Sequence, residues 1–440
     1  MSRKVLECYP TQLRKAISQF LPHQGLGLLS EDQRLRWTPR MLVVGAILMA
    51  WQASMTLKDR FGQARVTLVQ MYPTRRRPGQ TYEGFITALA DVSEQLLEKV
   101  CVGLRVAVQQ VAGTAWEICG WAVFGCDSSK IDCPMTLANE LAFGCGGKKK
   151  SGPQQLLTLM FHVGTGVPWS FMQGVACSSE RAHLLAMLQL LPAGALLLAD
   201  AGFTGYELLK ALMDSDRSFV IRVGSNVKLL TKLGYALKEH EHEGIVYLWP
   251  KGKQKKQCEP LVLRLIRFVD GRGRSICLLT NVLERERLSD QVALKMYRLR
   301  WGVELLFRAM KQTLERRKML SDCPTHAKVE LAWSVVGLWL LGLMSVQEIK
   351  AAGEDPQRWS PAQALRVVRQ ACNGTLGAGG CLREHVAGAL KDRYQRTKSK
   401  KARHWPHKKK EKPPGEPRAR MATPQEVLLA SMIRVKKIAA

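Results

Sequence analysis

The spacing of hydrophobic residues divides the chain into a helical first part and a mixed second part. Apolar side chains recur at helical intervals over residues 11–20, 39–52 and 81–111, which predicts three helices. From about residue 116 the pattern changes to short, nearly continuous apolar runs separated by polar turns. Runs of this kind are typical of buried strands. We therefore expect a mostly helical region over residues 1–115, followed by a domain that contains a sheet.

After residue 116 the apolar runs alternate with amphipathic stretches. Helices are expected from Ser178 to about Leu190 and from Tyr206 to Met213. Three runs precede the first of these helices, and strand and helix alternate afterwards, which predicts a mixed α/β sheet flanked by helices. The expected strands are Ile118–Phe124, Leu156–Val163, Trp169–Ala176, Ala195–Ala199 and Phe219–Val223.

Residues 224–285 depart from this alternation. Turns rich in lysine and glycine separate three apolar runs there, at 245–249, 261–269 and 275–280, which predicts a β-rich insertion. Beyond the insertion, residues 329–344 are apolar nearly all round a helix, so this helix should be buried.

The charge of the chain narrows the classes of function. The sequence has 66 Lys and Arg residues against 37 Asp and Glu residues, a formal net charge of +29. An excess this large indicates a polyanionic partner, either nucleic acid or an anionic membrane surface. The apolar runs at 41–51 and 331–344 are shorter than the roughly 20 residues that span a bilayer, which favours buried helices and no membrane partner. The N-terminus lacks the apolar region of a signal peptide, so a cytoplasmic protein is expected.

The C-terminal region, residues 349–440, contains the most basic segment of the chain. Residues 391–420 carry 13 Lys and Arg residues against 3 Asp and Glu residues, together with four prolines. This composition predicts a disordered tail that binds nucleic acid without sequence preference. A short helix over residues 424–435 is expected after it.

Two aspartates stand where buried strands are expected to end, Asp127 and Asp200. A buried carboxylate needs compensation for its lost hydration, and sheet proteins place their sites at strand ends. If these residues converge with Glu304, they form an all-oxygen cluster that favours Mg²⁺ or Mn²⁺. Two ions about 4 Å apart would serve phosphoryl transfer. The alternative for each aspartate is that it caps a nearby turn or helix.

Glu304 lies in a predicted helix with an unusual polar face. Tyr297, Arg300, Glu304 and Lys311 stand at offsets 0, 3, 7 and 14, which places them within an arc of about 60°. Arg308 falls on the same face. One carboxylate surrounded by cations and a phenol suits a group that holds a metal beside phosphates. The alternative is a solvated face on which Glu304 pairs with Arg300 or Arg308.

The spacing Tyr297-x2-Arg300-x3-Glu304-x6-Lys311 resembles the Y-R-E-K signature of DDE transposases from the insertion-sequence-four family of bacterial insertion sequences. The blocks Phe124–Ser129 and Leu198–Phe203 resemble the family's blocks around its first and second catalytic aspartate. The order Asp, Asp, Glu also fits.

This resemblance implies a ribonuclease-H-like catalytic fold interrupted by a β insertion. It implies that Asp127, Asp200 and Glu304 are the metal ligands, which bind two Mg²⁺ or Mn²⁺ ions, and that Tyr297, Arg300 and Lys311 contact DNA phosphates. By the same resemblance the N-terminal helices help to recognise terminal inverted repeats, and a homodimer joins two transposon ends, with movement by cut and paste. The corresponding segments are residues 1–115 (helical, DNA-binding), 116–223 and 286–348 (two parts of the catalytic domain), 224–285 (insertion) and 349–440 (C-terminal region).

The chain also departs from the family pattern. Ser128 follows the first aspartate, where the family often has glycine. Some relatives stack a tryptophan of the insertion region on a flipped base, whereas Trp249 and Trp301 are both expected here to pack in a core. Two other functions remain open from the sequence: a ribonuclease-H-like nuclease without strand transfer, and a catalytically idle DNA-binding protein.

Overall fold

The computed structural model describes residues 7–22, 36–53, 55–73, 77–146, 152–237, 239–250, 252–269, 273, 275–377, 380–392 and 415–439. The chain forms two compact units, each assembled from three separate stretches of sequence. Unit 1 comprises Met1–Ile118, Asp127–Ser179 and Trp301–Lys391. Unit 2 comprises Cys119–Cys126, Glu180–Arg300 and Asp392–Ala440.

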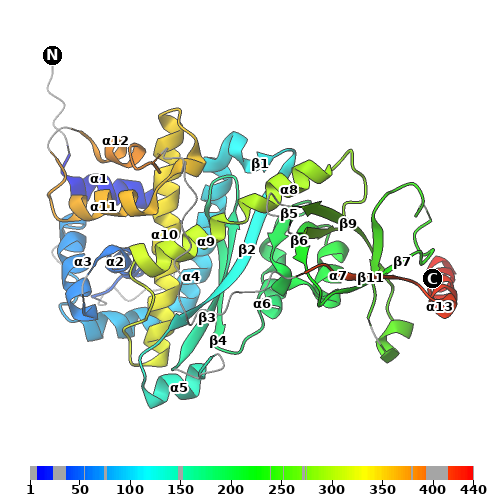
Figure 1. Ribbon diagram of the computed structural model, residues 1–440. Helices are drawn as coiled ribbons and strands as arrows, with labels where there is room; N and C mark the ends of the chain where they lie inside the picture. Colours follow the sequence, from blue (N-terminus) through cyan, green and yellow to red (C-terminus); the bar gives the residue numbers. More distant parts are fainter. Residues whose placement is uncertain are drawn as a thin grey trace. The chain divides into compact units, whose positions relative to one another are not determined.

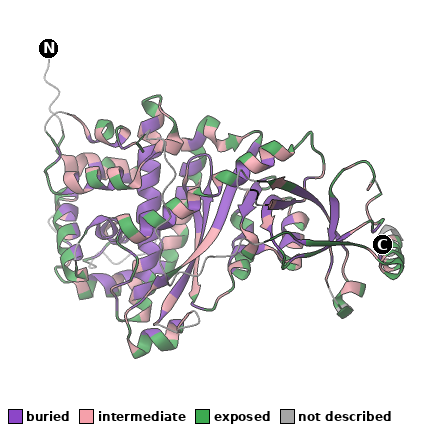
Figure 2. Ribbon diagram, in the orientation of Figure 1, coloured by how far each residue is buried: buried purple, intermediate pink, exposed green. Residues whose placement is uncertain are grey.

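Unit 1 is organised around one long apolar helix, α10 (Pro324–Ala351), which begins with a proline in its first turn. Its buried residues lie on all sides, as the continuous purple of this helix in Figure 2 shows. Within the described residues, α10 is the helix long and apolar enough to cross a membrane, and its apolar window is entirely buried inside the protein, as in a core helix. The buried helix predicted over 329–344 is confirmed.

The N-terminal helices of unit 1 begin where the sequence offers capping side chains. Thr38, Thr56 and Thr81 each accept a hydrogen bond from a backbone N–H of the first helical turn. The predicted helices over 11–20, 39–52 and 81–111 are present, and α10 packs against α2 and α4 (Figure 1). The helices of unit 1 beside α10 are α1 (Tyr9–Ser18), α2 (Pro39–Trp51), α3 (Leu57–Met71), α4 (Tyr82–Ala112), α5 (Leu137–Phe143), α9 (Gly302–Arg308), α11 (Pro361–Cys372) and α12 (Leu382–Ala387).

Strand β2 (Trp121–Asp132) contributes its first half to unit 2 and its second half, from Asp127 onward, to unit 1. In unit 1 this second half is followed across the sheet by β3 (Gln154–His162) and β4 (Val167–Val175), which pair antiparallel. The expectation that the strand ends before Asp127 is therefore wrong. The strand continues because its polar second half, which lacks an apolar run, is held by pairing: Asp132 forms a parallel bridge to Lys318.

Unit 2 holds the parallel part of the mixed sheet. The first half of β2 pairs parallel with β5 (Leu196–Ala199), and β5 pairs parallel with β6 (Ser218–Val223). Helices α6 (Glu180–Ala186), α7 (Tyr206–Asp214) and α8 (Asp290–Leu299) belong to the same unit. The predicted α/β class, a mixed sheet with flanking helices, is confirmed.

The β-rich insertion continues from β6 through antiparallel pairs as far as β7, and β11 then pairs parallel with β7. Its strand order is β6-β10-β9-β8-β7-β11. Three of these strands were predicted, β8 (Ile245–Leu248), β9 (Leu261–Val269) and β10 (Ser275–Thr280). The sequence pattern missed β7 (Lys228–Thr231) and β11 (Arg418–Met421).

Strand β11 corrects the prediction of a basic tail that is disordered over 391–420. Arg418–Met421 pairs parallel with Lys228–Thr231 and completes the sheet of the insertion (Figure 1). Helix α13 (Pro424–Ala439) follows and places Ala430 in the apolar cluster of Leu230, Tyr247 and Trp249. The segment is ordered there because the sheet edge and this cluster supply partners that its composition does not reveal. Residues 393–414 of the predicted tail lie outside the described residues.

Candidate active site

The signature segment is not one continuous helix, which corrects the prediction for residues 297–311. Helix α8 ends at Leu299, α9 begins at Gly302, and a π-helical turn occupies Ala309–Thr313. The break coincides with the boundary between the units, so Tyr297 and Arg300 belong to unit 2. Glu304, Arg308 and Lys311 belong to unit 1. The common arc calculated for an unbroken helix therefore does not apply.

A close packing contact lies at the break, at Gly302. A Cβ atom on Gly302 would lie 2.7 Å from the ring of Phe161 on β3, so only glycine allows α9 to approach the strand this closely. The turn before it is tightened, because the Arg300 N–H donates to the Tyr297 carbonyl at 3.1 Å. The Glu304 N–H likewise donates to the Trp301 carbonyl at 3.1 Å. These three-residue steps replace the four-residue steps of an α-helix.

In unit 2, one signature residue contacts the second predicted catalytic aspartate. The Tyr297 hydroxyl donates to Asp200 Oδ1 at 3.3 Å, and the Ala201 N–H donates to the same oxygen at 2.8 Å. Asp200 follows β5 directly, as predicted, and also caps the short 3₁₀ helix Ala201–Phe203. Within the described residues both hydrogen bonds to Asp200 fall on Oδ1, which leaves Oδ2 as the oxygen that could face a ligand.

The surroundings keep Tyr297 protonated. Burial, followed by the charge of Asp200, raises the pKa of Tyr297 to about 12, with Arg300 and Arg222 opposing the rise. The guanidinium of Arg300 lies 5.7 Å from the centre of the Tyr297 ring, and both side chains are buried. Tyr297 therefore acts as a neutral donor to Asp200 and does not compete with it as an anion.

In unit 1, a second signature residue contacts the block of the first predicted aspartate. The Lys311 ammonium donates to Ser129 Oγ at 2.7 Å. Asp127 Oδ1 accepts the Ser128 N–H at 2.8 Å, and the Ser128 hydroxyl lies 2.8 Å from the hydroxyl of Thr158 on β3. Ser128, which departs from the family's glycine, thus ties the Asp127 segment to the neighbouring strand. Sequence reasoning did not single out Ser129, although it stands two residues after Asp127.

Lys311 lies in the π-helical turn and is half-buried. Burial lowers its pKa, with Asp132 opposing the change. The turn is π-helical because the Leu314 N–H reaches back five residues to the Ala309 carbonyl. Single π-helical turns occur often at functional sites, because the extra residue re-aims a side chain. Here the turn presents the Lys311 ammonium to the strand that carries Asp127.

The chain beyond Lys311 is anchored to the end of the same strand. The Met319 N–H donates to the Asp132 carbonyl at 2.8 Å, and the Asp132 N–H donates to the Arg317 carbonyl at 3.2 Å. The Glu330 carboxylate on α10 accepts the N–H groups of Leu320 and Ser321 at 3.0 and 3.1 Å. The chain after Lys311 and the strand that carries Asp127 are therefore held in one local framework within unit 1.

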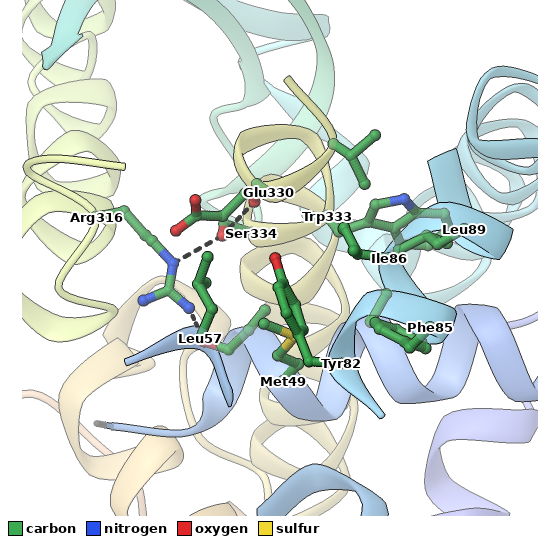
Figure 3. A pocket seen from close by; sticks show the side chains of 13 residues that line it. Met49, Leu57, Tyr82, Phe85, Ile86, Leu89, Arg316, Glu330, Trp333 and Ser334 are labelled. Atoms are coloured by element: carbon green, nitrogen blue, oxygen red, sulfur yellow. Dashed lines mark hydrogen bonds between the residues drawn. The ribbon is translucent and has the colours of Figure 1, made fainter. Parts of the chain in front are cut away.

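A buried arginine completes this framework (Figure 3). Arg316 donates to the Ser334 hydroxyl at 2.9 Å and to the Ala50 carbonyl at 3.2 Å, so it joins the end of the signature segment to α10 and α2. Burial lowers the pKa of Arg316 to about 10. Figure 3 shows this side chain beside Glu330 and the apolar wall formed by Met49 and Leu57. No sequence pattern indicated Arg316, because its role depends on contacts with distant helices.

The remaining predicted residues have differing surroundings. Glu304 is half-buried on α9, and Arg308 is exposed at the end of that helix. Trp249 is buried, as expected, and its indole N–H donates to the Cys258 carbonyl. Trp301 is 60% exposed, so the expectation that it packs in a core is wrong. Trp301 stands four residues after Tyr297, which on an unbroken helix would be about 40° from it, beside the polar face, so helical spacing alone already placed it away from the apolar side.

The donor types suit a hard divalent ion, since Asp127, Asp200 and Glu304 offer only carboxylate oxygens and each is half-buried. Among the described residues, no three His, Cys, Asp or Glu side chains stand together as a metal-binding group. Asp127 and Glu304 belong to unit 1 and Asp200 to unit 2. The convergence of these three residues therefore stays a prediction.

Comparison with known proteins indicates the class to which this site belongs. Residues 126–340 match the family model described as "Transposase DDE domain". This segment begins one residue before Asp127 and includes Asp200 and the whole signature. The match, together with the curated relatives below, supports a DDE transposase.

Two curated proteins share part of the sequence. One is named transposase y4zB, from Sinorhizobium fredii, and is 31% identical over 155 residues, which are 34% of this chain and 42% of that protein. The other is named as the transposase of insertion sequence element IS5377, from Geobacillus stearothermophilus, and is 29% identical over 127 residues, or 29% of this chain and 33% of that protein. The chain thus spans less than half the length of each of these relatives.

A solved structure was also compared. The piggyBac transposase in a synaptic complex with hairpin DNA has a TM-score of 0.41 and 13% identity, covering 90% of this chain and 88% of that one. This likeness is too low for its features to be transferred to the present chain.

Proposed function

We propose that this protein is a DNA transposase of the insertion-sequence-four type, which binds the terminal inverted repeats of an insertion sequence and cuts and joins DNA strands. The observation that carries the proposal is a pair of contacts. Tyr297 donates to Asp200 in unit 2, and Lys311 donates to Ser129 beside Asp127 in unit 1. Two residues of one signature thus each contact the block of a different predicted catalytic aspartate.

In this proposal Asp127, Asp200 and Glu304 hold two Mg²⁺ or Mn²⁺ ions. When bound, such ions activate the attacking oxygen and stabilise the leaving oxygen of phosphoryl transfer. The Tyr297 hydroxyl and the Ala201 N–H fix the orientation of the Asp200 carboxylate through Oδ1. Because Tyr297 stays neutral, it donates to Asp200 without placing a second negative charge beside it.

The cations of the signature have a separate task. Arg300, Arg308 and Lys311 contact DNA phosphates and stabilise the charge that develops on the reacting phosphoryl group. Lys311 is half-buried and already directed by Ser129, so little reorganisation is needed when DNA binds. Tyr297 would complete the phosphate contacts at the transposon end.

The partners follow from the same proposal. The substrates are the terminal repeats and the target DNA, which a net charge of +29 favours through release of counterions. The helical region over residues 1–115 contributes to recognition of the repeats. A homodimer joins two ends, movement is by cut and paste, and the protein acts on DNA in the cytoplasm without a membrane partner.

A cleavage and strand-transfer assay tests the function. The substrate is DNA that carries the element's own inverted ends, with Mg²⁺ or with EDTA, and wild-type protein is compared with Glu304→Ala and Glu304→Gln. We expect Mg²⁺-dependent nicks and joined products with wild-type protein, and a loss of at least about 1000-fold for both variants. The glutamine variant keeps the size of the side chain and removes only its charge.

The same assay separates the two alternatives. Nicks without joined products would identify a ribonuclease-H-like nuclease that lacks strand transfer. Binding without metal-dependent cutting, equal in wild type and both variants, would identify a DNA-binding protein whose catalytic face is idle.

A further inference from the structure

A cationic cavity of about 450 Å³ lies within unit 2, in and beside the β-rich insertion. It is lined by the start of β7, the loop after β8, the loop before α7 and strand β11. Four of its lining residues are cations from four separate segments, and they are Arg181, Lys228, Lys255 and Arg420. None of them belongs to the signature or to the matched aspartate blocks.

One carboxylate organises two of these cations. Glu426 on α13 accepts from Lys255 Nζ at 2.5 Å and from Arg420 at 2.6 and 2.7 Å. The hydrogen bonds from Arg420, followed by that from Lys255, hold the pKa of Glu426 far below its usual range. Lys255 also lies 4.6 Å from the centre of the Trp249 ring. Four cations against one carboxylate leave the cavity with a clear excess of positive charge.

The other two cations of the cavity, Lys228 and Arg181, are exposed to solvent. Lys228 is exposed on β7. Arg181 is also exposed, yet its guanidinium is held in place by a donated hydrogen bond to the Thr204 carbonyl at 3.1 Å. It rests directly on Gly205, where a Cβ atom would come within 2.8 Å of Arg181 Nη1. The guanidinium is therefore pre-positioned at the rim of the cavity.

We propose that this cavity is a second DNA-binding site, which holds phosphates of the DNA backbone through residues outside the signature. The proposal rests on the proposed transposase function, because a DNA substrate selects the backbone phosphate as the ligand. Phosphate contacts by Lys and Arg position a protein on DNA without reading its sequence. Strand β11 is part of the site, so the C-terminal segment takes part in DNA binding through an ordered strand.

The test measures how binding to duplex DNA without terminal repeats depends on salt, in EDTA so that no cutting occurs. Each phosphate contact contributes about 0.9 to the slope of log affinity against log salt concentration. We expect Lys228→Ala to lower the slope by roughly 0.9, and Arg181→Ala with Lys228→Ala by roughly 1.8. At moderate salt the double variant should bind about 10-fold more weakly.

Two further variants make the test specific. Arg366→Ala removes an exposed cation from α11 in unit 1 and should leave the slope unchanged. Gly205→Ala displaces Arg181 while its own extended backbone (φ −172°) suits alanine, so it should reproduce the effect of Arg181→Ala. Thermal unfolding of every variant confirms that the unit is folded. A double variant whose slope equals that of Arg366→Ala overturns the proposal.

Calorimetric titration with inorganic phosphate at constant ionic strength distinguishes DNA from a free anion as the ligand. If wild-type protein binds phosphate and the double variant does not, while both give the same salt slope on DNA, the cavity binds a small anion and the DNA proposal fails. The failure of the transposase proposal looks different. A protein that cuts no DNA but shows the changed slope retains this site, whereas an active transposase with an unchanged slope lacks it.

Discussion

Asp127 and Asp200 differ in how the signature residues contact them or their neighbours. Each aspartate accepts the N–H of the following residue at 2.8 Å, and each has a signature residue nearby. Asp200 is contacted directly by a neutral phenol, whereas the Lys311 ammonium binds Ser129. Tyr297 thus contacts the Asp200 carboxylate itself, whereas Lys311 contacts the Asp127 segment through a hydroxyl. The comparison teaches that one signature can supply a neutral donor at one predicted metal ligand and a cation beside the other.

The largest difference between the two regions should appear when Lys311 is replaced. Lys311→Met keeps much of the length of the side chain but removes the charge that is proposed to contact a DNA phosphate. We expect strand transfer to fall by about 100- to 1000-fold, in the range found when one stabilising donor is removed from an active site. Lys311→Arg should retain more activity than Lys311→Met. Equal losses in both variants would show that shape at this position matters more than charge.

The unfolding free energy of Lys311→Met tests whether Lys311 has a structural role. Burial lowers the pKa of Lys311, which means that the charged ammonium is less well solvated in the folded protein and lowers its stability. The variant should therefore unfold within about 1 kcal/mol of the wild type despite its lost activity. A large fall in the melting temperature would instead assign Lys311 a structural role.

Acidic pH should lower the stability of unit 1 because His162 becomes protonated. His162 lies on β3, the strand that also contacts α9. Burial lowers the pKa of His162 to about 4 from 6.5, and its ring nitrogens lie 3.0 Å from the Thr165 hydroxyl and the Trp116 carbonyl. Because the folded-state pKa is lowered, the stabilisation is present above pH 6.5 and is lost as the pH falls toward 4. The loss should reach about 3 kcal/mol in the free energy of unfolding.

Denaturant unfolding between pH 7.5 and about 4 measures this loss. The variant His162→Gln has no imidazole to protonate, so its stability should depend less on pH across this window. The difference between the two proteins isolates His162 from the carboxylates that titrate in the same range. Identical pH dependence in both proteins would contradict the assignment.

The smallest effect is expected at Tyr297. Tyr297→Phe removes the hydroxyl that donates to Asp200, while the Ala201 N–H still donates to the same oxygen. We expect strand transfer to fall by about 5-fold, since one hydrogen bond contributes about 1 kcal/mol. The required Mg²⁺ concentration should rise, because Asp200 is less well oriented. A loss as large as that of Lys311→Met would remove the contrast between the two regions.

Local patterns predicted most of the elements but not their limits. Helix α10 and strands β3, β5 and β6 follow directly from apolar runs in the sequence. The extension of β2 beyond Asp127 was missed because Asp127–Asp132 contains few apolar residues, and its order depends on pairing with distant segments. Strand β11 was missed for a similar reason, since its composition is basic and its partner lies far away in the sequence.

In the candidate site, too, local sequence patterns located some residues, whereas features that depend on contacts between distant segments were missed. Asp200 was located by the apolar run before it, and the signature spacing identified Tyr297 and Lys311. The break at Gly302 was missed because helical periodicity continues across it, and the close contact of Gly302 with Phe161 joins residues far apart in the sequence. Arg316 had no local signal at all, since its partners Ser334 and Ala50 come from other helices.

The parallel pairing of β7 with β11 also sets an order of events during protein synthesis. Lys228 and Arg418 are partners in the sheet and are 190 positions apart in the sequence. At about 5–20 residues per second, the ribosome needs roughly 10–40 s to make the intervening chain. During that interval the edge of β7 has no β11 to cover it, and the cavity lacks Arg420. The proposed second DNA-binding site would thus mature only after the signature segment has been synthesised.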